Sequence, residues 1–312
     1  MINLWSANEP FVSALLILAL GYFLKRVGIL RSTDGEVLAR IGLNVTLPAL
    51  VLLEVPKATL TSSNVLLPVI AFLASPLMVA IGLVAYRGQD RADRGLSMTA
   101  SAGYNIGLFA IPLVTGLYGA AGVARFALAD IGNVCAIFGI GYYMAYRYSP
   151  RRSDPHLSVL GTVKLIVGNI PFIAYLTGLA MILLDLQITG FPARVLAIPA
   201  AMNRGLALLV LGTLLRFRFP PGTWRTILAP LLVRYLFGIV AATLVLFLLP
   251  VSAEVRIALA GVFVMPAGLT LIAFSVKWGY DAERAAAILN ASIPASFILF
   301  WGVWAVGEFV VK

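Results

Sequence analysis

The chain has 312 residues, of which 61% are hydrophobic and only 12% are charged, and its mean hydropathy is +0.98. Soluble domains carry about 25% charged residues, so this much apolar surface has to face lipid. The basic residues behind the net charge of +10 fall mainly in short stretches between apolar runs. The positive-inside rule explains that distribution. A nucleic-acid partner is not expected, because no basic face interleaved with aromatic residues is found.

Ten apolar runs follow one another, each close to the roughly 20 residues that a helix needs to cross a bilayer. Because the runs are continuous, a β-barrel of alternating strands is excluded. The runs predict helices at residues 10–27, 37–55, 65–86, 95–118, 122–146, 159–184, 193–215, 226–249, 255–276 and 285–306. The sixth contains Pro171, before which the chain can form an interfacial helix.

Charge counting orients these helices. Sixteen of the 23 Lys and Arg residues lie in one set of loops and five in the opposite set, which places the first set in the cytoplasm. An even number of helices then leaves both termini outside. The start of the chain has no basic stretch and carries Glu9, so we expect no cleavable signal peptide. The expected location is a bacterial inner (plasma) membrane, crossed many times.

A polar basic linker at residues 147–158 divides the chain into two halves of five helices, residues 1–146 and 159–312. An odd number of helices in each half inverts one half relative to the other. The predicted fold is therefore an all-α polytopic membrane protein of ten transmembrane helices in two inverted five-helix repeats. Faint internal symmetry agrees: Gly119 and Asp130 correspond to Gly279 and Asn290 when 160 is added to their numbers.

The fourth and ninth runs are both broken near the middle, and they are matching members of the two halves. Gly103, Gly107 and Pro112 weaken the fourth, and Pro266 with Gly268 weakens the ninth. Backbone groups that lose their helical hydrogen bonds are tolerated at membrane depth only where they are buried in protein or line a water-filled cavity. Paired interruptions of this kind indicate a transporter's binding site. Two ordinary proline kinks are the alternative.

The segment from Asn105 to Leu113 resembles the fourth helix of the auxin efflux carrier family, which includes plant PIN carriers and many bacterial permeases, among them proteins described as malonate transporters. Residues 265–281 are similar to that family's second crossing helix and the loop after it, and residues 20–26 and 43–50 also match its pattern. The resemblance implies the inverted-repeat fold shared with bile-acid symporters and NhaA. It also implies a scaffold domain and a mobile, elevator-like transport domain, each drawn from both repeats.

By this resemblance Asn105 and Pro112 are crossing residues of the fourth helix, and Pro266 is their partner in the ninth. Asn44, in the second helix, is expected to face the crossing as a supporting residue. Plant relatives tend to have a proline just before the asparagine, where this chain has Tyr104. That departure puts auxin itself in doubt as the substrate.

Three ionisable residues fall well inside the runs: Asp130, Arg204 and Arg234. Such residues are costly in a membrane and are functional candidates. An arginine can bind a carboxylate with two hydrogen bonds, so we expect Arg204, with the neighbouring Asn203, and Arg234 to contact an anionic substrate. Asp130 is the candidate proton carrier if burial raises its pKa. The alternatives are that Asp130 pairs with one arginine to hold helices together, and that transport is uniport.

We therefore expect a secondary carrier of a small organic anion, a mono- or dicarboxylate such as malonate or an auxin-like acid, with its site at the two broken helices. No cofactor or metal is expected, because there is one cysteine and one histidine, Cys135 and His156. No enzyme is expected, since the chain has neither HExxH nor GxSxG and no paired intramembrane carboxylates. A sodium-coupled bile-acid-type symporter, a channel or a sensor on the same fold are the alternatives. The expected partners are the anion and the lipid bilayer, and a homodimer stays open.

Overall fold

The computed structural model describes residues 4–59, 61–151, 158–216 and 224–311, and its regular structure there is helical apart from one isolated β-bridge. Within these ranges, seven continuous helical stretches are long and apolar enough to cross a membrane. A bent pair of helices adds an eighth. The all-helical, multi-pass class predicted from composition is confirmed.

The expected fourth and ninth spans are broken, as their glycines and prolines predict. The fourth consists of α5 (Arg91–Ser101), a non-helical step, a π-helical turn at Ile106–Ala110 and the start of α6 (Ile111–Ala136). The ninth consists of α12 (Ala253–Phe263) and α13 (Thr270–Trp278). The π-helical turn precedes Pro112, which lacks the N–H that a regular helix would use. Neither α5, α12 nor α13 is long enough to cross a bilayer alone.

Two further boundaries differ in detail from the sequence prediction. The expected fourth and fifth helices are joined within α6, where Gly119 has φ 54° and ψ −140° and interrupts the helical path. Glycine adopts this conformation without the steric cost that a side chain would add. The sixth run is two helices, α8 (Val159–Val167) and α9 (Ile170–Leu183), bent by 69°. Pro171 lies in the first turn of α9, where a missing N–H is tolerated.

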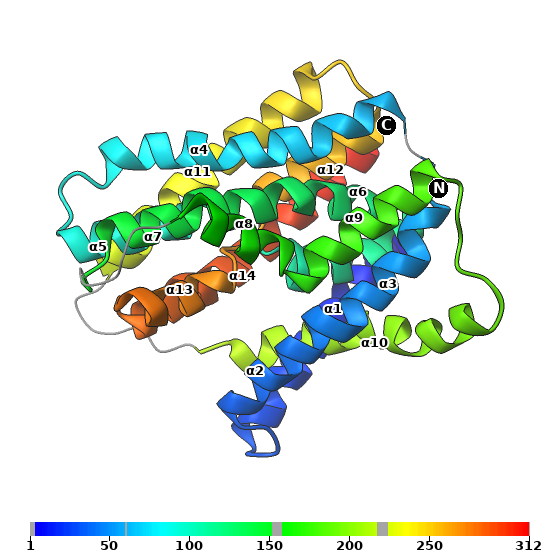
Figure 1. Ribbon diagram of the computed structural model, residues 1–312, viewed down its shortest axis with the longest axis horizontal. Coiled ribbons are helices and arrows are strands. Elements are labelled where there is room, and N and C mark those ends of the chain that lie inside the picture. The colour runs from blue at the N-terminus through cyan, green and yellow to red at the C-terminus, as the bar shows by residue number, and fades with distance from the viewer. Residues whose placement is uncertain (1–3, 60, 152–157, 217–223, 312) are drawn as a thin grey trace. The chain divides into compact units, whose positions relative to one another are not determined.

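The helices form two compact units, each described by itself. The first unit contains Met1–Ser62, Ile106–Leu128 and Asn169–Leu215. Besides α9 and the first part of α6, its helices are α1 (Leu4–Arg26), α2 (Ser32–Ile41), the π-helical turn Gly42–Thr46, α3 (Leu47–Glu54), the 3₁₀ turn Val55–Lys57 and α10 (Gly190–Leu214). Within it, α10 contacts α1, α2 and α3, and α3 also contacts α9 (Figure 1).

Two glycines set the close packing of α1 on α10. A Cβ atom at Gly21 of α1 would overlap the carbonyl group of Leu209, and one at Gly212 of α10 would overlap the carbonyl oxygen of Leu18. Because the contact is reciprocal, the two helix backbones touch directly. Small residues are what allows such an approach between membrane helices, where packing replaces the hydrophobic effect as the main attraction.

The second unit contains Ser63–Asn105, Ala129–Gly168 and Arg216–Lys312. Besides α5, α8, α12 and α13, its helices are the 3₁₀ turn Ser62–Val65, α4 (Leu66–Ala85), the end of α6, the π-helical turn Ile137–Gly141, α7 (Tyr142–Tyr148), α11 (Trp224–Leu248), α14 (Ala282–Val306) and the π-helical turn Gly307–Val311. Within it, α11 contacts α4, α5, α12 and α14, and α13 packs on α14 (Figure 1). Tyr86 and Met98 belong to one of its buried apolar clusters.

One side of α11 leaves large apolar side chains uncovered. Leu232, Leu236, Val240 and Leu244 are each at least half exposed, and their spacing of four residues places them on one helical face. A contiguous exposed apolar face of this size is unusual for a soluble protein. Contact with lipid chains explains it.

Candidate functional site

The two broken spans cross at their breaks. Tyr104 and Ala267 form an isolated antiparallel β-bridge, and the backbone N–H of Asn105 donates to the carbonyl oxygen of Pro266 at 2.9 Å. Tyr104, Met265 and Ala267 are at most 1% exposed. The unwound backbones therefore satisfy part of each other's hydrogen-bonding capacity, as buried backbone at membrane depth must. Tyr104, Asn105 and Pro266, all predicted from the sequence, are brought together here.

Asn133, on α6, holds the first break. Its Oδ1 accepts the backbone N–H of Tyr104 at 2.8 Å, and its Nδ2 donates to the carbonyl oxygen of the same residue at 2.9 Å. The side chain thus pairs with Tyr104 as a neighbouring strand would. Its Nδ2 also donates to Asp130 Oδ1 at 2.7 Å, and Asn133 is 1% exposed. The predicted carboxylate Asp130 therefore lies one hydrogen bond behind the crossing.

Ser292, on α14, holds the second break. Its Oγ accepts the backbone N–H of Ala267 at 3.2 Å and donates to the carbonyl oxygen of Leu289 at 2.7 Å. The hydroxyl of Tyr235, on α11, donates to the carbonyl oxygen of Ser292 at 2.6 Å. Each break is thus fixed by one polar side chain from a long neighbouring helix.

Arg234, on α11, reaches both breaks from one side. Its Nη2 donates to the carbonyl oxygens of Ala100 and Gly103, and its Nη1 donates to that of Met265 at 3.2 Å. The guanidinium carbon lies 5.0 Å from the centre of the Tyr104 ring, and the residue is 1% exposed. These carbonyls belong to the C-terminal ends of α5 and α12, or follow them directly, where the helix dipole places partial negative charge. The cation therefore satisfies both ends at once.

The other predicted residues lie in the first unit. Asn203, 0% exposed on α10, donates from Nδ2 to Thr46 Oγ1 at 3.0 Å, while its buried Oδ1 has no hydrogen-bond partner among the described residues. Asn44 lies in the π-helical turn with Thr46 and is exposed. Pro112 is buried near the start of α6.

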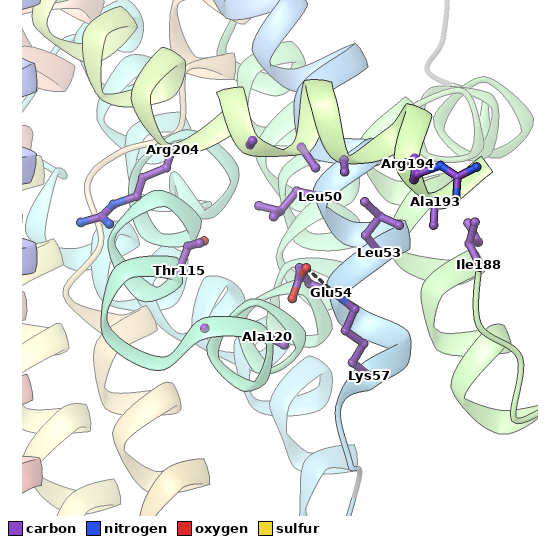
Figure 2. A pocket seen from close by; sticks show the side chains of 14 residues that line it. Leu50, Leu53, Glu54, Lys57, Thr115, Ala120, Ile188, Ala193, Arg194 and Arg204 are labelled. Carbon is purple, nitrogen blue, oxygen red and sulfur yellow. Dashed lines mark hydrogen bonds and ion pairs between the residues drawn. The ribbon is translucent and has the colours of Figure 1, made fainter. Parts of the chain in front are cut away.

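Arg204, also on α10, donates from Nη2 to Ser13 Oγ at 3.1 Å. It lines a pocket within the first unit (Figure 2). The two predicted arginines therefore belong to different units, Arg204 to the first and Arg234 to the second.

A family model described as membrane transport protein matches residues 6–301. The chain belongs to this family. This agrees with the resemblance to auxin efflux carriers. A transporter described only as uncharacterised, from Methanothermobacter thermautotrophicus, is 29% identical over 220 residues, which are 68% of this chain and 69% of that protein. Another from Methanocaldococcus jannaschii is 28% identical over 167 residues, which are 50% of this chain and 53% of that protein. The protein is a membrane transporter and not an enzyme.

Three polar residues of this transporter's crossing were not selected from the sequence as site residues: Asn133, Ser292 and Tyr235. For Asn133, the position three residues after Asp130 on one helix is the available signal, because that spacing puts both side chains on one face. Ser292 and Tyr235 carried no comparable signal, since serine and tyrosine are common in membrane helices.

Proposed function

We propose that this transporter is a secondary carrier of a small organic anion, a mono- or dicarboxylate, that binds at the crossing and moves by alternating access. The observation that carries the proposal is the crossing itself. Two unwound segments meet at Tyr104 and Ala267, and dedicated side chains hold them from Asn133, Ser292 and Arg234. Irregular backbone held this firmly at membrane depth is the arrangement that transporters use for substrate.

Charge at the half-helix ends favours an anion. Arg234 neutralises the C-terminal ends of α5 and α12. The second half of the ninth span, α13, begins at Thr270 with no side-chain hydrogen bond capping its N-terminus, and such an end attracts negative charge. Asn105, 6% exposed, supplies a side-chain amide at the crossing. Since the hydrogen bonds of Arg234 go to backbone carbonyls, we assign it to holding the crossing and not to contacting substrate.

We further propose ten transmembrane helices in two inverted repeats, with both termini outside a plasma membrane. One pair of corresponding positions and one pair of similar contacts support the repeat. Gly119 and Gly279 have positive φ angles of 54° and 77°, and both follow the second part of a broken span. Asn133 and Ser292, 159 residues apart in number, accept the backbone N–H of the first and the second break. Each compact unit also draws segments from both halves of the chain, as a scaffold and a transport domain would. The middle of the linker, with His156, lies outside the described residues.

Asp130 is the proposed coupling residue. It accepts a hydrogen bond from Asn133, which in turn holds both backbone polar groups of Tyr104. A change in the protonation of Asp130 changes what its oxygen can accept, and the effect reaches the crossing through one side chain. Uniport driven by the membrane potential is the competing mechanism.

Ligand-induced stabilisation of the purified protein tests the substrate class, because a ligand that binds the folded state raises its melting temperature by mass action. We expect one or a few small carboxylates from a panel to raise Tm, and Asn105→Ala to abolish the shift without lowering the ligand-free Tm by more than a few degrees. Asn64→Ala, a buried asparagine of the second unit outside the crossing, is the control and keeps the shift. Sodium is varied in parallel to detect a sodium-coupled symporter. Stabilisation by amines or neutral compounds alone would reject the anion.

A further inference from the structure

The first unit contains a pocket of about 680 Å³ between α3, α6 and α10. Such a volume lies within the usual range for small-molecule sites. Figure 2 shows Leu50 and Leu53 of α3 on one wall, Thr115 of α6 on another, and Arg204 and Arg194 toward opposite ends. None of these side chains belongs to the crossing, which lies in the second unit.

Small residues on one face of α10 keep this pocket open. The face consists of alanines with a spacing of three or four residues, so that they share one side of the helix. They are Ala193, Ala197, Ala200 and Ala201. Larger apolar side chains at these positions would fill the space between α10 and α3. The walls are thus mainly apolar, with charged groups at defined places.

The charges in the pocket are predominantly positive. Lys57, Arg194 and Arg204 line it with only one carboxylate, Glu54, which pairs with Lys57 at 2.8 Å. Within the described part of the chain, neither arginine has a carboxylate at ion-pair distance. The pair neutralises itself, so two positive charges remain.

The backbone at the start of α10 adds to the positive electrostatic potential of the pocket. α10 begins at Gly190, and the residue before it, Thr189, makes no side-chain capping hydrogen bond. The first-turn N–H groups of a helix without such a cap carry partial positive charge. Ile188, Ala193 and Arg194, which flank this helix start, all line the pocket.

The two arginines are too far apart to bind one small anion together. They are ten residues apart on α10, which corresponds to about 15 Å along the axis. Arg204 is held by Ser13 and lies against Gly116, and its buried Nε has no hydrogen-bond partner in the part of the chain that the structure describes. Arg194 is exposed and lies 6.0 Å from the ring of Phe191. One arginine is therefore fixed and partly buried, and the other is free to move at the rim.

We propose that this pocket is an anion-selective site with two positions, in which a small carboxylate is first attracted by Arg194 and then bound by Arg204. That this carboxylate is also the transported substrate rests on the proposed carrier function, but the anion selectivity of the pocket does not. The apolar walls favour a carboxylate with a short hydrocarbon body. Glu54 competes with it for Lys57.

Thiol labelling tests the pocket without knowledge of the transported substrate. Cys135 is the only cysteine in the chain, so Cys135→Ser provides a background for Ala197→Cys or Ala201→Cys, both exposed in the pocket. The thiol is reacted with an anionic methanethiosulfonate (ethylsulfonate) and with a cationic one (ethyltrimethylammonium). Gln187→Cys, exposed and not lining the pocket, corrects for the intrinsic reactivities.

We expect the anionic reagent to react faster in the pocket than at the control, relative to the cationic one, on the order of tenfold. Either Arg194→Gln or Arg204→Gln should reduce this preference severalfold. Removing one positive charge about 10 Å from the thiol slows the reaction with the anionic reagent and speeds the reaction with the cationic one. Glu54→Gln should raise it. Equal rates for the two reagents, unreactive thiols at both positions, or a preference that both arginine variants leave unchanged would each overturn the proposal.

A second arm identifies the occupant and separates this proposal from the carrier function. Malonate and benzoate, as probes of the carboxylate class, should slow labelling, and Arg204→Gln should remove the protection. Blocking of the thiol by phosphatidylglycerol nanodiscs but not by phosphatidylcholine, without carboxylate protection, would replace the carboxylate by a lipid phosphate and refute the proposal. Anion-selective labelling in a protein that shows no carboxylate transport would reject the carrier and leave the pocket standing. Carboxylate transport without a labelling preference would reject the proposed pocket and retain the carrier function.

Discussion

Replacing Arg234 is the sharpest perturbation of the crossing. Its guanidinium donates to three backbone carbonyls in two broken spans and is 1% exposed. A hydrogen bond to a charged group contributes about 1.5–3 kcal/mol, and effects within one network are not additive. Arg234→Met should therefore cost on the order of 5 kcal/mol in the free energy of unfolding. By the scaling for domains of 150–250 residues, this corresponds to a loss in Tm of about 10 °C or more.

Arg234→Lys separates charge from geometry. Lysine keeps the positive charge, but it is a compact point charge without the planar fork that reaches two spans. We expect it to recover part of the lost Tm while leaving substrate affinity and turnover impaired. Arg256→Met is the matched control, because Arg256 donates a hydrogen bond of 2.8 Å to the carbonyl oxygen of Leu246 and is only half-buried. Arg256→Met should lower Tm by about 3 °C or less.

Differential scanning fluorimetry in detergent, with transport in proteoliposomes, provides the two readouts. If Arg234→Met melts and transports like the wild type, the three hydrogen bonds do not hold the crossing, and the reasoning is refuted. If Arg234→Met retains its Tm but loses ligand binding alone, the residue contacts substrate, as first predicted from the sequence.

Three other predictions follow from single contacts. Asn133→Leu removes both hydrogen bonds to Tyr104 and should abolish ligand-induced stabilisation. Unchanged ligand affinity would contradict the conclusion that Asn133 holds the first break. Gly212→Val should strongly reduce the yield of folded protein, because the side chain would overlap the backbone of Leu18; normal monodispersity and Tm in size-exclusion chromatography and fluorimetry would argue against the close packing. Asp130→Asn should eliminate substrate accumulation driven by a pH gradient while preserving exchange in proteoliposomes; accumulation at the wild-type level would favour uniport.

Much of the broken-helix architecture could be predicted from composition and backbone chemistry. Pro112 and Pro266 lack a donor and stand near Gly107 and Gly268, and this combination predicts interruptions in the fourth and ninth runs. A proline alone is not enough, since Pro199 and Pro230 lie inside continuous helices. Gly119 lies between two expected helices, where its positive φ is found. Apolar run lengths predicted the multi-pass class for the same reason, since the bilayer thickness fixes what a helix must contain.

The partners of the buried charges could not be predicted, because they depend on which helices meet in three dimensions. The sequence offered Arg234 a substrate carboxylate or Asp130. The structure gives it the carbonyl groups of two breaks located 131 and 31 residues away. Likewise, the hydrogen bond that Thr46 accepts from Asn203 joins residues 157 positions apart within the first unit, where Asn44 is exposed. Partners at such separations leave no periodic signal.

Counterflow in proteoliposomes tests the central claim most directly. Vesicles loaded with an unlabelled carboxylate that stabilises the protein are diluted into a trace of the same labelled compound. A carrier with its site at the crossing predicts saturable, trans-stimulated uptake that Asn105→Ala abolishes and Asn64→Ala retains. Uptake that does not saturate and is not stimulated by internal substrate, or that persists in Asn105→Ala, would contradict alternating access at this site.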